Sequence, residues 1–334
     1  MPKKRKSFDL PEKSSKSAKK HEENDTDLKE RIEKLYGIPF QQDFYDFWKL
    51  CIDLKSQNPL DCLLCVGLRL VGPFYYLHHI DKQDTSKPPE YYHLKWRHYY
   101  DTPEFLTLLI STRNKGYHVG YFNDDPSDVE AIVASNTAKD GQYTVQGDNL
   151  FAAVSSHIQN YLKNANKEET EVAKEIQTKL EKIAQEKVYS LQLKSEKVKI
   201  REKKMVVAKS FHKLGIVVPV VNDVGYRPLP HKDNQLEKLF KKITDAKDDS
   251  IRMEAFEPIQ EMVTFIQFAN DECDYGMGLE LGIDVFVNGS KYFFKLSNNL
   301  LMMAYKLLKR NLYAKIIENH LKDRKMENVD RLNT

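Results

Sequence analysis

The sequence predicts an α+β fold, with mixed helices and short antiparallel strands, N-terminal and C-terminal halves that pack together, and a basic N-terminal tail. Apolar residues recur at steps of three and four in several segments, which is typical of amphipathic helices. Shorter apolar runs end at Gly, Asn, Asp or Pro, which is typical of strands and turns. Apolar residues make up 41% of the 334 residues, which is enough to bury a sizeable core.

The N-terminal tail, residues 1–27, is rich in Lys and Ser and lacks apolar periodicity, so we expect it to be disordered. Eight basic and two acidic side chains give residues 1–20 a net charge of +6. The remaining 44 basic and 47 acidic side chains give −3, which argues against a basic nucleic-acid-binding body. The basic run at residues 3–6 is typical of a nuclear import signal. Contact with DNA or another anionic surface is the second interpretation, and an ordinary solvated tail is the third.

The composition also indicates a reducing intracellular compartment. Four cysteines are too few for a disulfide scaffold in a chain of 334 residues. No apolar run approaches the roughly 18 residues that a membrane-spanning helix needs. No apolar stretch follows the basic N-terminus, as it would in a secretory signal.

The first elements of the body are two predicted helices. A short amphipathic helix begins at Leu28 and ends at Gly37, which suits a helix C-terminus. The second helix has one apolar face, made of Phe44, Phe47, Trp48 and Cys51. Residues 57–127 are predicted to form short strands and loops. Within them, residues 116–122 form a strand that ends at a turn over residues 123–126.

The middle of the chain is predicted to be helical. A helix at residues 150–162 leads into a highly charged helix with one apolar stripe, made of Val172, Ile176, Leu180, Ile183 and Ala184. Because charged residues cover its other face, a packing helix is favoured over a nucleic-acid site. We place a domain boundary near residue 160, which gives an N-terminal domain at residues 28–160 and a C-terminal domain at residues 161–334.

A stiff loop is predicted after this boundary. Residues 216–221 are apolar and β-branched, and Pro219 makes an edge strand more probable than a central one. A turn at residues 222–225 leads directly into Tyr226 and Arg227, and prolines follow. Arg and Tyr are frequent at binding hot spots, and a stiffened loop lowers the cost of ordering. An interface anchor is one interpretation, and a surface arginine in a turn is the other.

The segment at residues 270–282 combines acids with glycines. Pro258 suits the first turn of a helix whose apolar pattern stops at Asn270. Asp271 and Glu272 then lie at the negative end of the helix dipole, which disfavours each carboxylate by about 0.3–1 kcal/mol. With like charges nearby, one carboxylate should have a raised pKa, as a general base requires.

The residues after these acids are predicted to form a β-hairpin. Residues 279–287 alternate in polarity, Asn288-Gly289 is a two-residue hairpin signal, and residues 291–296 form the return strand. The acids would then occupy a loop between a helix and a hairpin. A solvated acidic loop is the plain alternative. A calcium site is disfavoured, because the spacing lacks the alternating oxygen ligands and the final Glu of an EF-hand.

The run at residues 270–282 resembles the signature of the histone PARylation factor family. Further matching blocks lie on both sides, at residues 43–49, 70–73, 147–154, 222–227, 258–262 and 305–312. The resemblance extends from about residue 28 to the C-terminus. Long matching blocks in one order are far more specific than any single short motif.

The resemblance implies a function shared with a partner. Members of this family bind the catalytic domain of DNA-damage-activated poly(ADP-ribose) polymerases and redirect ADP-ribosylation to serine by completing a joint active site. The family's catalytic glutamate corresponds to Glu272, and Asp271 lies at the polymerase contact. Arg227, with Tyr226 beside it, corresponds to the arginine that docks the polymerase's C-terminal end.

The same resemblance implies that the chain is not an enzyme by itself. NAD would be held by the polymerase, and the chain would have no cofactor or metal of its own. The expected substrates are histones or nucleosomes and the polymerase itself. The expected location is the nucleus, at chromatin with DNA damage under repair, and the free chain is expected to be monomeric.

Two other functions stay open. The chain could be a chromatin or nucleic-acid-binding adaptor that acts through its basic tail, or a stand-alone hydrolase or transferase that uses Glu272. A zinc site is also conceivable, because Cys62 and Cys65 have a zinc-like spacing and histidines follow. Buried cysteines are the favoured interpretation, since leucines separate the two and no second cysteine pair follows.

Overall fold

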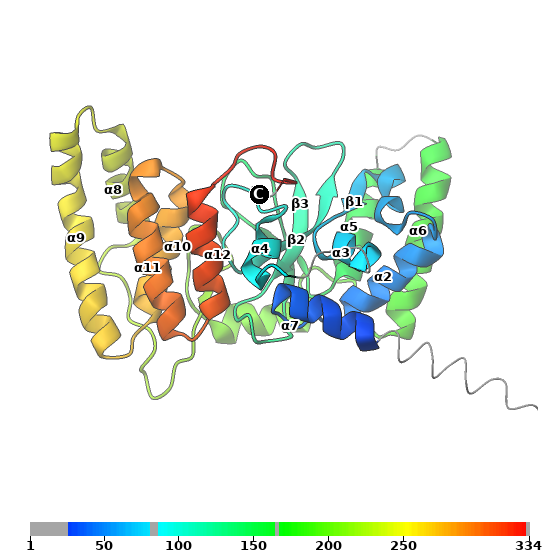
Figure 1. The fold of residues 1–334 in the computed structure, drawn as a ribbon, viewed down its shortest axis with the longest axis horizontal. Helices are drawn as coiled ribbons and strands as arrows, with labels where there is room; N and C mark the ends of the chain where they lie inside the picture. Colours follow the sequence, from blue (N-terminus) through cyan, green and yellow to red (C-terminus); the bar gives the residue numbers. More distant parts are fainter. Residues whose placement is uncertain (1–25, 81–85, 164–166, 332–334) are drawn as a thin grey trace, which may run out of the picture.

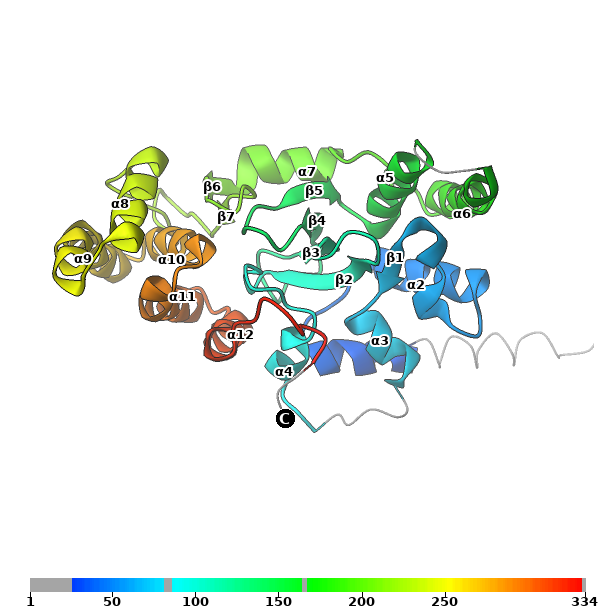
Figure 2. The same cartoon turned by 90° about the horizontal axis from the view of Figure 1, so that it is seen from above.

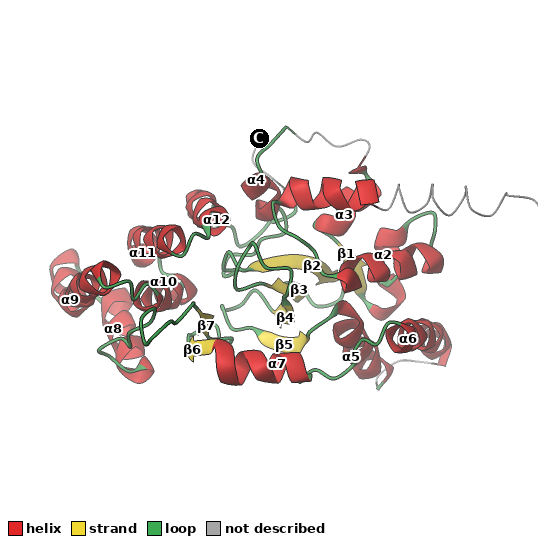
Figure 3. Ribbon diagram, turned by 90° about the horizontal axis from the view of Figure 1, so that it is seen from below, coloured by secondary structure: helices red, strands yellow, loops and turns green. Residues whose placement is uncertain are grey.

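The computed structural model describes residues 26–80, 86–163 and 167–331, and it has the predicted α+β fold (Figure 1). The tail that was expected to be disordered, residues 1–27, lies outside these ranges except for its last two residues. A five-stranded antiparallel sheet lies in the middle of the molecule. Figures 2 and 3 show α2, α5 and α6 on one side of this sheet and α8 to α12 on the other.

The sheet follows chain order, so each strand pairs with the next. Its strands are β1 (Leu68–Leu70), β2 (Phe105–Ser111), β3 (His118–Phe122), β4 (Ile132–Asn136) and β5 (Thr144–Gly147). Phe105 of β2 pairs with Phe122 of β3, and His118 pairs with Asn136 of β4. A second sheet of two strands joins β6 (Val206–Ala208) to β7 (Ile216–Val217). The strand prediction for residues 116–122 is confirmed by β3.

The helices surround both sheets. In the first half they are a helix at residues 26–36, α2 (Gln42–Leu54), α3 (Pro73–His78), α4 (Pro89–Leu94), α5 (Leu150–Leu162) and α6 (Lys167–Glu186). The second half has α7 (Glu196–Ile200), α8 (Asp233–Asp245), α9 (Asp249–Asp271), α10 (Gly276–Asn288), α11 (Phe294–Leu307) and α12 (Asn311–Lys322). α10 packs on α11, α11 on α12, and α12 on α4, so this series of helix contacts joins the two halves.

The helix predictions for the first half are confirmed. The helix at residues 26–36 ends at Gly37, whose N–H donates to the carbonyl of Glu33 at 2.8 Å. The apolar face of α2 is buried in the largest core cluster, and α5 has the predicted bounds. In α6 the buried stripe includes Ala173, whereas Val172 is 47% exposed, so the stripe is displaced by one residue at its start.

The predicted hairpin at residues 279–296 is wrong. Residues 276–288 form helix α10, a 3-10 turn follows at residues 291–293, and α11 then begins. Every residue of α10 up to Val287 is buried, so the helix has no solvent-facing side from which a 3.6-residue period could be recognised. Gly289 has a φ of 76°, so the Asn-Gly pair ends a helix instead of joining two strands.

The predicted start of α9 is also wrong. The helix begins at Asp249, with the side chain of Asp248 accepting a hydrogen bond from Ile251 N at 2.9 Å, and Pro258 lies inside the helix. Ile251 and Met253 are 47% and 72% exposed, so the first turns have no buried apolar stripe to mark them. The predicted end is confirmed, because α9 stops at Asp271 with Glu272 as its C-cap.

The predicted edge strand after residue 215 is shorter than expected. Only Ile216 and Val217 pair with β6, and an isolated bridge between Val221 and Val224 closes the turn that follows. This turn leads into Tyr226 and Arg227, as the sequence indicates. Among the described residues, no helix combines the length and the apolar character that crossing a membrane requires.

Candidate functional site

The predicted base Glu272 lies in a tight turn between α9 and α10. Its N–H donates to the carbonyl of Phe268 at 3.1 Å, and Asp274 N donates to the carbonyl of Ala269 at 2.8 Å. Cys273, between the two acids, has a φ of 67°. The Glu272 side chain is 61% exposed. These bonds hold its backbone firmly while its carboxylate faces solvent, which suits a group that must reach a substrate on another molecule.

The loop that carries Tyr226 and Arg227 is bonded to the same turn. Gly225 N donates to Asp274 Oδ1 at 2.8 Å, and Gly276 N donates to the carbonyl of Gly225 at 2.9 Å. Two segments that are almost fifty residues apart in the chain therefore form one surface. Asp274 is buried, and it serves as the acceptor that joins the loop to the start of α10.

Arg227 contacts the predicted base directly. One guanidinium nitrogen, Nη2, forms an ion pair with Glu272 Oε2 and lies 3.0 Å from Asp274 Oδ2. The hydrogen bond to Glu272, and then the charges of Glu272 and Asp274, raise the pKa of Arg227 above its ordinary value. The sequence argument considered only like charges beside Glu272, whereas the structure places an opposite charge in contact with it.

Tyr226 points to the other side of the loop. Its hydroxyl donates to Glu280 Oε2 at 3.0 Å on α10. One turn further along this helix, Asp284 Oδ1 accepts a hydrogen bond from Phe211 N at 2.9 Å. Burial raises the pKa of Glu280 to about 7 and raises that of Asp284 well above its ordinary value. Glu280 therefore anchors the loop that carries Arg227, and Asp284 anchors the segment at Phe211 to the same buried helix.

Asp271, the fourth predicted site residue, is the last residue of α9. Its side chain is exposed and makes no hydrogen bond or ion pair with other described residues. The structure thus brings Arg227, Glu272 and Asp271 to one exposed edge of the helical half. Tyr226 lies behind them, against α10.

The comparison with known families fits this geometry. The family model described as histone PARylation factor 1 matches residues 27–324, which include the whole of this surface. The chain belongs to the histone PARylation factor 1 family.

Three curated relatives carry the name Histone PARylation factor 1. The Mus musculus protein is 47% identical over 314 residues, which is 92% of this chain and 90% of the mouse protein. The Bos taurus protein is 47% identical over 313 residues, covering 92% of this chain and 89% of its own length. The Danio rerio protein is 46% identical over 310 residues, covering 92% and 88%. Family membership therefore applies to nearly the whole chain.

Sequence reasoning missed four residues that shape the site in this family member. Asp274 binds both Gly225 and Arg227. Gly225 lies in the predicted turn, but its bonds to Asp274 and Gly276 were not expected. Glu280 and Asp284 fall within the segment predicted as a strand, and their four-residue spacing fits one face of a strand or of a helix, so it favoured neither.

The two candidate zinc cysteines pack with the largest apolar cluster. Cys62 is buried within it, and Cys65 is half-buried against it. His93 is also buried, and its Nε2 lies 2.8 Å from the carbonyl of Tyr36. Across the part of the chain that the structure describes, no group of three or more His, Cys, Asp or Glu side chains is arranged to hold a metal ion.

Replacing Gly225 with alanine should disrupt the loop that carries Tyr226 and Arg227. Gly225 has a φ of 137°, and an added Cβ would lie 2.1 Å from the carbonyl oxygen of Pro219. The loop must shift to relieve this contact, which displaces Arg227 from Glu272. We expect binding to the polymerase, measured by calorimetry, to fall at least about tenfold, the equivalent of 1.4 kcal/mol.

The control for this change is Asp223→Gly in the same loop. Asp223 is exposed and has a φ of 63°, so glycine should relieve local strain and preserve binding. Unchanged binding by the Gly225→Ala protein would show that the loop conformation is not needed for docking.

Replacing Glu280 with glutamine should change how stability depends on pH. Because the folded pKa is about 7 and the ordinary value is 4.5, the folded state holds the proton more tightly. The stabilisation from Glu280 is therefore complete below about pH 4.5 and is lost as pH rises to about 7. Glutamine keeps an oxygen that can accept from Tyr226 and cannot ionise.

The measurement is urea unfolding of both proteins at pH 5 and pH 8. From pH 5 to pH 8, the free energy of unfolding of the variant should rise relative to that of the wild type by roughly 2–3 kcal/mol, at 1.36 kcal/mol per pKa unit. The negative charge of Asp233 contributes to the raised pKa of Glu280, and Glu280 in turn raises the pKa of Asp284. A difference that stays constant between pH 5 and pH 8 would contradict this assignment.

Proposed function

We propose that this chain docks on the catalytic domain of a DNA-damage-activated poly(ADP-ribose) polymerase and supplies Glu272 to a joint active site that modifies serine. Membership of the histone PARylation factor 1 family supports the accessory role. The observation that supports the role of Glu272 is its position, an exposed carboxylate held at a rigid helix junction and in contact with Arg227. Asp271 would add a partner contact beside it.

The chemistry requires a base from outside the polymerase. A serine hydroxyl is a poor nucleophile near neutral pH until a positioned base takes its proton. Glu272 would accept that proton while the serine oxygen forms a bond to the anomeric carbon of the NAD ribose and nicotinamide leaves with the electrons of the broken bond. A carboxylate acceptor is already ionised and needs no base. One added carboxylate could thus change the class of residue that is modified.

Arg227 would have two roles in this scheme. In the free chain it neutralises Glu272 and Asp274. The terminal carboxylate of the polymerase would compete for the same guanidinium, because Arg binds carboxylates with two parallel hydrogen bonds. Docking would then turn Arg227 toward the partner and leave Glu272 free to act as a base. Tyr226, held by Glu280, fixes the direction from which Arg227 leaves the loop.

The polymerase would supply the NAD site, and this chain would supply the base. NAD would be bound by the polymerase, and histones would be the main substrates, as the relatives' name indicates. The chain would act in the nucleus and would be monomeric until it docks. The adaptor function through the basic tail has less support, because the family match covers residues 27–324 and does not include the basic residues of the tail.

A reconstitution assay tests this function. A serine-containing histone peptide and labelled NAD are incubated with the chain alone, with the DNA-activated polymerase alone, or with both. The label that is transferred to serine is then measured. We expect serine modification only with both proteins. Serine modification by this chain alone would instead support a stand-alone transferase. Serine modification by the polymerase alone at the same rate would remove the need for an accessory factor.

A further inference from the structure

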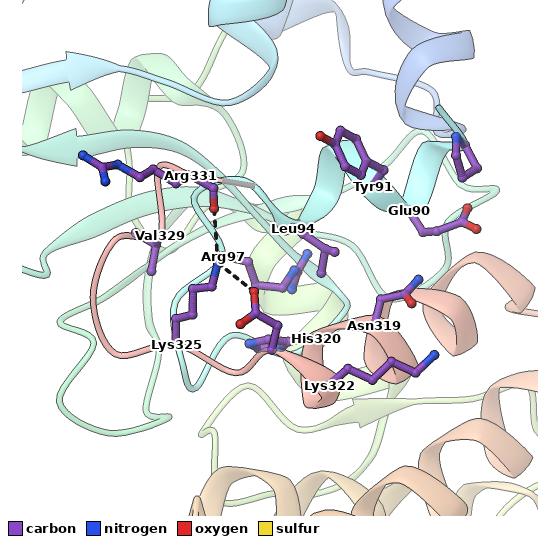
Figure 4. A pocket seen from close by; sticks show the side chains of 12 residues that line it. Glu90, Tyr91, Leu94, Arg97, Asn319, His320, Lys322, Lys325, Val329 and Arg331 are labelled. Atoms are coloured by element: carbon purple, nitrogen blue, oxygen red, sulfur yellow. Dashed lines mark hydrogen bonds and ion pairs between the residues drawn. The ribbon is translucent and has the colours of Figure 1, made fainter. Parts of the chain in front are cut away.

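A cavity of about 280 Å³ lies between α4, α12 and the segment that follows α12. Figure 4 shows side chains from these elements around it, with Glu90 and Tyr91 of α4 on one side and Val329 and Lys325 on the other. The cavity shares no lining residue with the site at Arg227 and Glu272. Its size is near the lower end of the roughly 300–1,000 Å³ of small-molecule sites, so it suits a small ligand better than part of a folded protein.

The wall of this cavity contains a buried histidine without hydrogen bonds. His320 is 3% exposed, and among the described residues neither of its ring nitrogens has a hydrogen-bond partner. A buried polar group left unsatisfied costs about 1–3 kcal/mol. Burial, and then the charges of Arg97 and Arg324, lower the pKa of His320 well below its ordinary value. The ring is therefore neutral, with one N–H to donate and one nitrogen to accept.

A buried guanidinium lies in the same wall. Arg97 is 5% exposed, and among the described residues its guanidinium donates to backbone carbonyl oxygens, those of His93, Asp101, Thr102 and Phe105. Within the described residues no carboxylate lies within ion-pair distance of it. The negative charges of nearby Asp101 and Glu104 favour its charged form, so the guanidinium contributes a positive charge to the cavity wall. Lys322 adds a second cation at the rim.

We propose that this cavity binds a small organic anion, whose carboxylate or phosphate accepts a hydrogen bond from His320 and is attracted by the positive charges of Arg97 and Lys322. The apolar part of the ligand would lie against Tyr91, Leu94 and Val329. The site joins α12, in the helical half, to α4, in the other half, and a bound anion would strengthen that contact. This inference does not depend on the role of Glu272.

Calorimetric titration of the full chain tests the proposal with matched probes. Benzoate and phenyl phosphate carry the two candidate anionic groups, and benzyl alcohol is the neutral control. We expect at least one anion to bind with a Kd of about 1 mM or tighter, and benzyl alcohol to bind at least tenfold more weakly. Benzoate alone would identify a carboxylate ligand, and phenyl phosphate alone a phosphate. Equal binding of the neutral probe, or no binding by either anion, would overturn the proposal.

The variant His320→Phe separates a ligand site from a structural histidine. Phenylalanine keeps a flat ring against Phe286, which contacts His320 at a centroid distance of 5.7 Å, and it removes both ring nitrogens. We expect anion binding to weaken at least tenfold while the thermal midpoint without ligand is unchanged or higher. Lys322→Ala should weaken binding and Lys242→Ala, an exposed lysine on α8, should not. Full anion affinity in the His320→Phe protein would contradict the proposal.

Discussion

Replacing Glu272 with glutamine should reduce the rate of serine ADP-ribosylation by roughly 10²–10⁴-fold, the usual contribution of a general base. Glutamine has nearly the same shape and can still accept a hydrogen bond from Arg227, but it cannot take the serine proton. The turn that holds residue 272 depends on backbone hydrogen bonds that the change does not touch. Affinity for the polymerase should therefore stay close to that of the wild type.

The measurement is the initial rate of serine modification at saturating concentrations of the variant, together with its Kd for the polymerase. Asp271→Asn is the matched control, because it removes the adjacent charge and leaves Glu272 in place. We expect it to weaken docking while preserving the rate at saturation. A Glu272→Gln protein that supports the wild-type rate would remove Glu272 from the chemistry.

Replacing Arg227 with alanine should mainly abolish docking. Arginine hot spots contribute about 2–4 kcal/mol to binding, so we expect the affinity for the polymerase to fall by about 30–1,000-fold. The folded chain should change little, because exposed ion pairs such as Arg227–Glu272 contribute only about 0–1 kcal/mol to stability. Calorimetric binding and urea unfolding of the same protein distinguish these two effects.

Arg227→Lys sharpens this prediction. Lysine keeps the positive charge but presents a single ammonium instead of a planar fork, so it cannot form two parallel hydrogen bonds with a carboxylate. If the terminal carboxylate of the partner is the target, lysine should recover only part of the lost affinity. Complete recovery by lysine would indicate that Arg227 acts only through its charge.

The position of Glu272 at a helix end could be predicted from sequence because a helix period stops there. The apolar residues of α9 recur until Asn270, and the acids follow immediately, so their place at the helix end needed no tertiary information. The start of the same helix could not be predicted, because the turns before Pro258 expose their apolar residues. A helix boundary can be predicted from apolar periodicity only where one face of the helix is buried.

That residues 276–288 form a helix, α10, could not be predicted for the opposite reason. A helix that is buried on all sides has no solvent-exposed face, and a short stretch of it can alternate in polarity like a strand by chance. The Asn-Gly pair at its end then favoured a hairpin, although the same left-handed conformation also ends helices. Glu280 and Asp284 were consequently placed on the wrong kind of element.

The pairing of Arg227 with Glu272 could not be predicted from either segment alone. The two residues are 45 positions apart, and their contact depends on the bonds from Gly225 to Asp274 and Gly276. Family resemblance identified both as site residues but did not show that they neutralise each other in the free chain. That contact suggests why the carboxylate would stay inactive until a partner takes the arginine.

The most direct test of the joint active site is a competition experiment. Increasing amounts of the Glu272→Gln protein are added to a fixed mixture of wild-type chain, DNA-activated polymerase, NAD and serine peptide. If the chain docks through Arg227 and contributes Glu272 in trans, the variant should displace the wild type and suppress serine modification in proportion to its share of the total. The doubly changed protein, Glu272→Gln with Arg227→Ala, should not compete. Undiminished serine modification in a large excess of the Glu272→Gln protein would contradict the account.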